Sequence, residues 1–249
     1  MHAESSPEWQ QLVAEIVRCR RCPRLVAWRE QVARDKRSAY RHWDYWGRPV
    51  PGFGDHRARL LIVGLAPGAH GSNRTGRMFT GDSSGDTLYA ALYRAGFANQ
   101  PHATHRDDGL TLHDTFITAI VRCAPPANRP TRDEMATCAP FLAREWQLLP
   151  RIRVVLALGR LAFMACCQLL QQEGYALPRL PFRHALHHPA RHNHTDRTIH
   201  LLASYHPSRQ NTQTGRLTPQ MLDAVLHRAR AMLEDSQTVG ETQRSDMER

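Results

Sequence analysis

The sequence predicts an α/β fold in which a parallel sheet is covered by helices on both faces. Short apolar runs of strand length recur along the chain, and stretches with helical periodicity separate them. The most unusual polar loops follow directly on these apolar runs. Because open α/β sheets bind ligands beyond the C-terminal ends of their strands, these loops lie where such a fold places its functional site.

The predicted elements alternate in type along the chain. A helix is expected over residues 8–34, and a loop rich in aromatic residues, Pro and Gly follows over residues 43–54. The predicted strands are residues 59–64, 115–121, 153–158 and 198–204. The predicted helices between and after them are residues 86–94, a helix opening at Thr131, residues 161–171 and residues 219–233. Thr131 with Glu134 three positions later is the pattern of a capping box.

The length and composition favour one main domain. The chain has 249 residues, 41% of them hydrophobic, which is enough for a substantial core. Residues 1–233 are expected to form a single domain, whereas residues 234–249 are polar and aperiodic and are predicted to be a disordered tail. The segment 184–200 is rich in histidine but lacks a regular ligand spacing, so a surface loop is favoured over a metal site.

The charge indicates a polyanionic partner. A net charge of +10 favours nucleic acid ahead of an anionic membrane. Nearly all of the positive residues are arginines, which bind phosphate bidentately, although a GC-rich genome would explain the choice of Arg over Lys equally well. The first seven residues lack the apolar stretch of a signal peptide, and no run approaches a membrane span. We expect a cytoplasmic protein, and a monomer.

Four cysteines are candidate metal ligands. Cys19 and Cys22 form a CxxC pair, Cys123 closes a predicted strand, and Cys138 lies in the helix that follows. In a reducing compartment such a set favours metal ligation over disulfides. Four thiolates hold either zinc or a [4Fe–4S] cluster, and their spacing does not separate the two. The other two cysteines are expected to be small buried residues of a helix: Cys166 and Cys167.

The polar loops suggest removal of a base from the sugar of damaged DNA. The base must first leave the stack, and its pocket must then stack on it, recognise its edge, stabilise the departing anion and place a water. Phe79 offers a stacking ring, Asp82 can position or activate water, and His206 can donate to a base carbonyl. Asn128 can recognise an amide-like edge. The alternatives are a core Phe, an N-cap Asp, a packed loop His and a turn-forming Asn.

Further residues are predicted to contact substrate or DNA. The turn over residues 64–71 exposes backbone N–H groups suited to a base oxygen or a phosphate. The predicted substrate-binding residues are Gly64, Leu65, Ala66, Pro67, Gly68 and Phe79. The predicted DNA contacts are Arg74 and Arg77, for which a solvated surface position is the alternative, and the loop residues Ser208, Arg209, Gln210 and Asn211. Leu217 is either an inserting wedge or a core residue.

Five motifs together resemble the family 5 (type B) uracil-DNA glycosylases. They are residues 45–55, 64–77, 79–82, 121–126 and 208–218, and the likeness covers roughly residues 10–232. The resemblance implies a three-layer αβα sandwich around a four-stranded parallel sheet. It also implies a [4Fe–4S] cluster rather than zinc, held by Cys19, Cys22, Cys123 and Cys138.

The same resemblance implies an activity and roles for the site. Asp82 takes over the water-activating role that other members of the superfamily place near Leu65 or Ala66, His206 contacts the base, and Asn128 supports catalysis or base contact. The expected activity is hydrolysis of the N-glycosidic bond of uracil and other deaminated bases, such as hypoxanthine, in DNA, which starts base excision repair. The alternatives are a non-catalytic metal-cysteine nucleic-acid-binding protein and a hydrolase of small nucleotides.

Overall fold

The computed structural model describes residues 6–247, with side chains up to residue 234. The α-helices are α1 (Pro7–Arg18), α2 (Pro23–Asp35), α3 (Ser72–Thr75), α4 (Ser83–Arg94), α5 (Arg132–Gln147), α6 (Arg160–Gln172), α7 (Arg209–Gln213) and α8 (Pro219–Met247), with 3₁₀ turns at Ser38–Tyr40 and Pro126–Asn128. The strands are β1 (Phe53–Gly54), β2 (Leu60–Gly64), β3 (Thr115–Ala119), β4 (Val154–Leu158), β5 (Tyr175–Ala176), β6 (His187–His192) and β7 (Thr198–Ser204).

The sheet is wider than predicted. Its described strands follow the order β1-β3-β2-β4-β7-β6-β5, and the four inner strands β3, β2, β4 and β7 run parallel. These are the four strands that the sequence predicts. The prediction of a sheet with only four strands is wrong, because β1 adds antiparallel to β3 and a β5–β6 extension adds antiparallel to β7.

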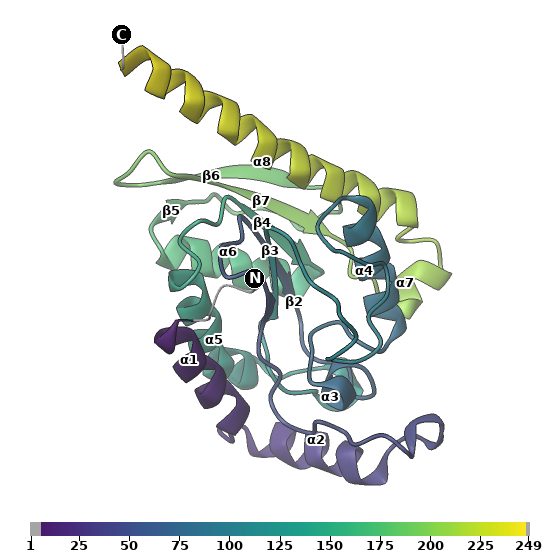
Figure 1. The fold of residues 1–249 in the computed structure, drawn as a ribbon. Coiled ribbons are helices and arrows are strands. Elements are labelled where there is room, and N and C mark those ends of the chain that lie inside the picture. Colours follow the sequence, from purple (N-terminus) through teal and green to yellow (C-terminus); the bar gives the residue numbers. More distant parts are fainter. Residues whose placement is uncertain (1–5, 248–249) are drawn as a thin grey trace.

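Two hydrophobic cores make the αβα layers. Along β2, Leu61 and Val63 join one core with α1, α5 and α6, whereas Leu60 and Ile62 join the other with α4 and α8. All five residues of β2 are buried, as expected for a strand covered on both faces. Figure 1 shows α5 and α6 on one side of the sheet and α4 and α8 on the other. The three-layer prediction is therefore confirmed.

The N-terminal helix is two helices. The prediction of one helix over residues 8–34 overlooked Pro23, whose ring would clash with the carbonyl four residues earlier in a continuous helix. The first helix ends at Arg18, and Cys22 is the N-cap of α2, with Pro23 in its first turn. The break places the CxxC pair in the connection between the two helices.

The histidine-rich segment is partly a strand. β6 pairs with β7 from His187 opposite Leu202 to Arg191 opposite Thr198, so the prediction of a surface loop over residues 184–200 is wrong for its middle. Only Ala190 of β6 is buried. The strand therefore shows almost no apolar alternation, which is the signal that sequence analysis uses.

The last helix is longer than predicted. α8 continues from Pro219 to Met247, into the segment for which the composition predicted a disordered tail. The last two residues of that segment lie outside the described part of the chain. No helix within residues 6–247 has both the length and the apolar character needed to cross a membrane.

Candidate active site

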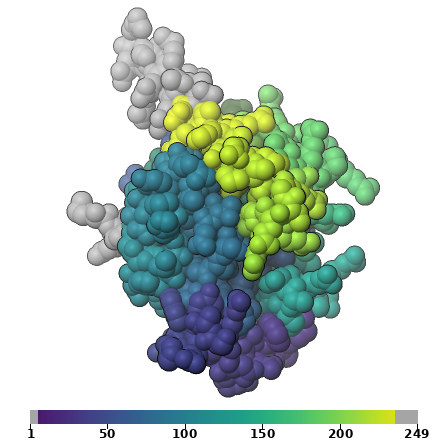
Figure 2. All heavy atoms as spheres, turned by 90° about the vertical axis from the view of Figure 1, so that its right-hand side faces the viewer, coloured from purple at the N-terminus to yellow at the C-terminus, as the bar shows by residue number. Residues whose placement is uncertain are grey.

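The site lies where three neighbouring parallel strands end. β2 ends at Gly64, β7 ends at Ser204, and β4 lies between them. The residue after β4 is Gly159 at φ +95°, where a Cβ would lie 3.4 Å from the Cβ of His206. The loops after β2 and β7, far apart in sequence, therefore meet at one edge of the sheet. Figure 2 shows a face on which α7 and the start of α8, in yellow-green, lie above the purple N-terminal region.

Phe79 joins the two loops. Its backbone is in the left-handed region at φ +52°, and its side chain is 9% exposed. The ring lies against Gly64, where a Cβ would come within 2.8 Å of Cζ. The ring also stacks beside His206, with ring centroids 5.8 Å apart and planes 29° apart. Gly64 is therefore needed for this close approach, and the ring packs beside His206 at the edge of the site.

Asp82 is both the N-cap of α4 and a neighbour of the glycine turn. Its Oδ1 accepts hydrogen bonds from the backbone N–H groups of Ser84 at 3.0 Å and Gly85 at 3.1 Å. Oδ2 faces the turn, where a Cβ on Gly68 would lie 2.8 Å away and a Cβ on Gly71 would overlap it. No described residue donates a hydrogen bond to Oδ2. Burial raises the pKa of this carboxyl, although the two amide bonds oppose the shift.

His206 is held as a neutral imidazole. Burial lowers its pKa to about 4. Its backbone carbonyl accepts a hydrogen bond from Nδ2 of Asn211 at 2.8 Å, which fixes the loop. Its ring nitrogens have no hydrogen-bond partner among the described residues. At neutral pH this imidazole therefore keeps one N–H donor available for a ligand.

The predicted glycine turn is positioned by the sheet and by α3. The carbonyls of Gly64 and Leu65 accept from the N–H groups of Ile120 and Val121, both at 3.0 Å. Leu65 and Ala66 are half-buried and pack against the core, Pro67 is buried, and the carbonyl of Gly68 accepts from Asn73 at 3.0 Å. The turn is thus tied down on both sides of the residues that face Asp82.

Two arginines are not where the sequence predicted them. The sequence predicts that Arg74 and Arg77 contact phosphates, but their exposed fractions are 3% and 4%. Arg77 forms a bidentate ion pair with Asp108 at 2.7 and 2.8 Å, and its Nε donates to Thr80. The guanidinium of Arg74 donates to backbone carbonyls of His70 and Gly81. Both guanidinium groups are therefore buried inside the protein, where hydrogen bonds to these internal acceptors offset the cost of removing the groups from water.

The loop after His206 forms the short helix α7. Ser208 is its N-cap, and its hydroxyl accepts from the N–H of Asn211 at 3.4 Å. Arg209 and Gln210 are exposed on the first turn. Leu217 is fully buried in the core, so it is not an inserting wedge. Of the four predicted DNA contacts here, Arg209 and Gln210 have side chains free to meet a duplex, whereas Ser208 and Asn211 also hold the loop.

No described hydrogen bond or ring contact joins the Asn128 side chain to the groups just described. It is exposed, at φ +55°, directly after Ala127 at φ +51°. No described hydrogen bond joins its side chain to the rest of the chain. Two consecutive left-handed non-glycine residues are costly, and such strain concentrates at functional sites.

The four predicted cysteine ligands line one pocket. Cys19, Cys22, Cys123 and Cys138 surround it together with residues of α2, α5 and the end of β3. Burial raises the pKa of Cys123 to about 12 and also raises those of Cys22 and Cys138. Within residues 6–247, no group of three or more Cys, His, Asp or Glu side chains is arranged to hold a metal ion. Cys166 is fully buried in α6, as predicted, and Cys167 only partly.

Two hydrogen bonds to these sulfurs were not predicted. The guanidinium of Arg29, which is 2% exposed, donates from Nη1 to Sγ of Cys123 at 2.9 Å. The backbone N–H of Arg122 donates to Sγ of Cys138 at 3.4 Å. The Arg122 side chain forms a buried ion pair with Glu145 at 2.6 Å. No sequence pattern distinguishes these buried arginines from the many exposed ones, so only the fold could identify them.

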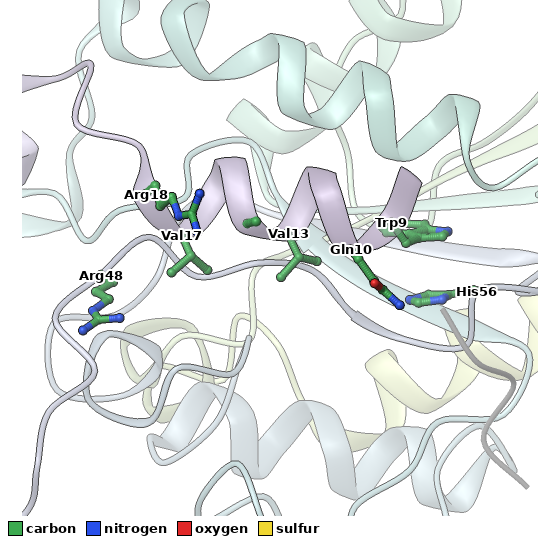
Figure 3. Close-up of a pocket in the computed structure, with 8 residues that line it drawn as sticks. Trp9, Gln10, Val13, Val17, Arg18, Arg48 and His56 are labelled. Atoms are coloured by element: carbon green, nitrogen blue, oxygen red, sulfur yellow. The ribbon is translucent and has the colours of Figure 1, made fainter. Parts of the chain in front are cut away.

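A separate groove lies between α1 and the segment around residues 48–56 (Figure 3). Trp9 stacks on His56 at one end, with ring centroids 4.3 Å apart, and Arg18 and Arg48 lie at the other end. None of the predicted site residues lines this groove. It is therefore distinct from the site at the ends of β2 and β7.

Comparison with known proteins identifies close relatives. The family model described as the Uracil DNA glycosylase superfamily matches residues 51–230. A type-5 uracil-DNA glycosylase of Thermus thermophilus is 53% identical over 220 residues, which are 88% of this chain and 96% of that protein. One of Mycobacterium tuberculosis is 52% identical, covering 89% of this chain and 81% of that protein. One of Pyrobaculum aerophilum is 45% identical, covering 90% and 92%.

Proposed function

The chain belongs to the type-5 group of the uracil DNA glycosylase superfamily, and on that premise we propose that it hydrolyses the N-glycosidic bond of uracil in DNA and so starts base excision repair. The observation that carries the proposal is the unpaired Oδ2 of Asp82 beside the glycine turn, with the neutral His206 joined to the same turn through Phe79. A non-catalytic DNA binder would not need either polar group at this edge.

His206 is proposed to stabilise the leaving base. Negative charge develops on the base carbonyl as the glycosidic bond breaks, and a fixed N–H donor in a dry site stabilises that charge. A pKa of about 4 keeps the imidazole neutral at pH 7. One ring nitrogen then carries a proton without a positive charge that would have to be desolvated first.

Asp82 is proposed to position the attacking water. Two backbone N–H groups hold Oδ1, so Oδ2 is left to accept from water over Gly68 and Gly71. The raised pKa makes the carboxylate a stronger base than a solvated one. Its negative charge also favours the developing oxocarbenium ion of the sugar.

We propose that the pocket also accepts hypoxanthine. Ala66 is small and half-buried, so this part of the turn has no long side chain that selects one base by shape. Asn128 would then contact the base edge or support catalysis after the exposed turn closes on DNA. The strained backbone of Ala127 and Asn128 supports a functional position for this turn.

The cysteine pocket is proposed to hold a [4Fe–4S] cluster through Cys19, Cys22, Cys123 and Cys138. The donor set fits, because four thiols line one pocket and two of them accept N–H hydrogen bonds, which favour thiolates. Each of the four thiols would supply one thiolate ligand to the cluster. When bound, the cluster would tie the connection between α1 and α2 to β3 and α5.

The cell compartment and oligomeric state remain predictions. None of the six cysteines, all of which lie within the described residues, forms a disulfide, which supports a reducing compartment. We propose that the enzyme acts as a monomer.

The activity is tested with duplex oligonucleotides that contain one uracil or one hypoxanthine, followed by alkaline cleavage at abasic sites. We expect cleavage of both, none of a matched thymine duplex, and none of free deoxyuridine. Absence of abasic sites in both damaged duplexes, with iron-loaded protein, would contradict the proposal. Release from the free nucleoside would favour a small-nucleotide hydrolase.

A further inference from the structure

Arg74 connects the glycine turn to the segment that directly precedes Asp82. It lies in α3, directly after the glycine turn, and is 3% exposed. Its Nε donates to the carbonyl of His70 at 2.8 Å, and its Nη2 donates to the carbonyl of Gly81 at 2.7 Å. His70 precedes Gly71, which touches Oδ2 of Asp82, and Gly81 directly precedes Asp82. One planar guanidinium thus spans both sides of the carboxylate.

The position of the guanidinium is fixed by two aromatic rings. The Arg74 Cζ lies 3.9 Å from the ring centroid of Tyr40 and 4.0 Å from that of Trp43. Both distances are within the range of favourable cation–π contacts. The segment that carries these rings is joined to the turn a second time, because Tyr45 Oη lies 3.1 Å from Nδ1 of His70.

Gly81 is adapted to this arrangement. It has φ +81°, and a Cβ there would lie 2.5 Å from Nη2 of Arg74. The backbone before Asp82 therefore has both the conformation and the space that the guanidinium requires. A buried arginine used only for packing would not need a left-handed glycine at its acceptor.

Arg74 also affects the charge state of Asp82, together with the other charged groups around this carboxylate. Asp86 on α4 raises the pKa of Asp82 in addition to burial, whereas Arg74 and the amides of Ser84 and Gly85 lower it. Tyr89 of α4 is also within electrostatic range of Asp82, but its hydroxyl donates to the carbonyl of Met78. Arg74 is the cation that acts on Asp82 among the described groups that affect it.

We propose that Arg74 is a positioning residue for base release: its fork fixes the Asp82 carboxylate against the glycine turn, and its positive charge favours the carboxylate over the acid form. The inference deepens the proposed function, since it rests on Asp82 acting in catalysis. It assigns Arg74 no contact with DNA or with the base.

Two substitutions separate the fork from the charge. Arg74→Lys keeps a cation but cannot span both carbonyls, so we expect the single-turnover rate of uracil release at its pH plateau to fall about 10- to 100-fold. Arg74→Met also removes the cation, so Asp82 binds its proton at a higher pH. The acidic limb of the rate profile should then move upward in pH for Arg74→Met and stay in place for Arg74→Lys.

The readouts include DNA affinity and thermal unfolding. Affinity for the uracil duplex should stay within about twofold, because Arg74 contacts no phosphate. Arg59→Lys is the matched control: this partly buried arginine pairs with Asp114 at 2.5 Å at the opposite end of β2, and its substitution should leave the rate and the profile unchanged. Equal loss of thermal stability in both lysine variants, with loss of rate only in Arg74→Lys, supports positioning.

Folded Arg74 variants with the wild-type plateau and profile would overturn the inference, while a loss of rate in Asp82→Ala would show that the proposed function still stands. Wild-type rates in Asp82→Ala would overturn both. If the Arg74 variants do not fold, Trp43→Leu is tested instead. This substitution removes one of the two rings that hold the Arg74 guanidinium, at a side chain that is itself only half-buried. We expect about a 3- to 10-fold lower plateau at unchanged affinity, and an unchanged plateau would reject the inference.

Discussion

Two regions at the same edge of the sheet differ in the hydrogen bonds made by their functional side chains. In the cysteine pocket, sulfur atoms accept hydrogen bonds from the Arg29 side chain and the Arg122 backbone. In the loop site, Oδ2 of Asp82 and the imidazole nitrogens of His206 have no hydrogen-bond partner within the described chain. Burial shifts the pKa of groups in both regions, yet the sulfurs of Cys123 and Cys138 have N–H donors, whereas the free carboxylate oxygen and the imidazole nitrogens of the loop site have none.

The difference indicates which region is structural and which is reactive. A thiol with raised pKa becomes a ligand only when a metal replaces its proton, and the neighbouring N–H donors then stabilise the bound thiolate. Asp82 and His206 are only half-buried, so their unpaired polar atoms are free to bind water or a substrate. The comparison assigns stability to the cysteines and chemistry to Asp82 and His206.

The largest expected effect is on chemistry at the loop site. Asp82→Ala and His206→Ala should each lower single-turnover base release by about 10²–10³, because each removes one electrostatic contact to developing charge. Binding of the uracil duplex and iron content should be nearly unchanged. Wild-type rates in the double variant, with its iron retained, would break the assignment of this region as reactive.

The next effect is on stability at the cysteine pocket. Cys123→Ser should lose the iron, its broad visible absorption, and about 5–10 °C of melting temperature, since a missing ligand uncouples α1 and α2 from the sheet. Cys166→Ser is the control, because Cys166 is buried in α6 outside the pocket and should retain the iron. A colourless wild-type protein that contains zinc after anaerobic purification would contradict the cluster.

A smaller effect concerns the pH dependence of folding. The folded pKa of His206 is about 4, below the value of 6.5 for a solvated imidazole, so the unfolded chain binds more protons between these values. The free energy of unfolding should therefore fall as pH drops from about 6.5 to about 4, by up to about 3 kcal/mol from this group. Urea titrations at several pH values measure the free energy of unfolding. The substitution His206→Gln should flatten its dependence on pH over this range.

His187 sharpens this prediction as a matched control. Its pKa is also lowered to about 4 by burial, but it lies in β6, bonded to His200 and Arg228. His187→Gln should reduce the same pH dependence while leaving base release unchanged. Loss of base release in His187→Gln would contradict the assignment of His206 to the active site and of His187 to a position outside it.

The elements that the sequence predicted well are those with strong local signals. The four inner strands are continuous apolar runs buried on both faces, and the Thr131–Glu134 capping box is present as predicted. β6 was missed because its hydrogen bonds to β7, rather than an apolar alternation, define it. Pro23 is a local signal for the break between α1 and α2, and helical periodicity alone does not contain it.

For the site, the motifs predicted which loops meet but not how their arginines are used. Phe79 and His206 are brought together, and Asp82 lies on the glycine turn. Arg74 and Arg77 are interior groups because carbonyl and carboxylate acceptors surround them, and such acceptors come from segments distant in sequence or from backbone. A sequence with many arginines gives no local signal for that choice.

The smallest expected effect distinguishes exposed arginines from buried ones. Arg209 is exposed on the first turn of α7, beside the loop of His206, whereas Arg153 is exposed just before β4, at the opposite edge of the sheet. If α7 meets the duplex, Arg209→Ala should lower DNA affinity a few-fold and reduce the slope of log K against log salt by about 0.9, the value for one phosphate contact. Arg153→Ala should change neither quantity, because its edge faces away from the site.

Fluorescence anisotropy between about 50 and 200 mM salt measures both the DNA affinity and its salt dependence. Equal slopes for Arg209→Ala and the wild type would remove α7 from the DNA interface, and the net charge of +10 would then have to act through another face.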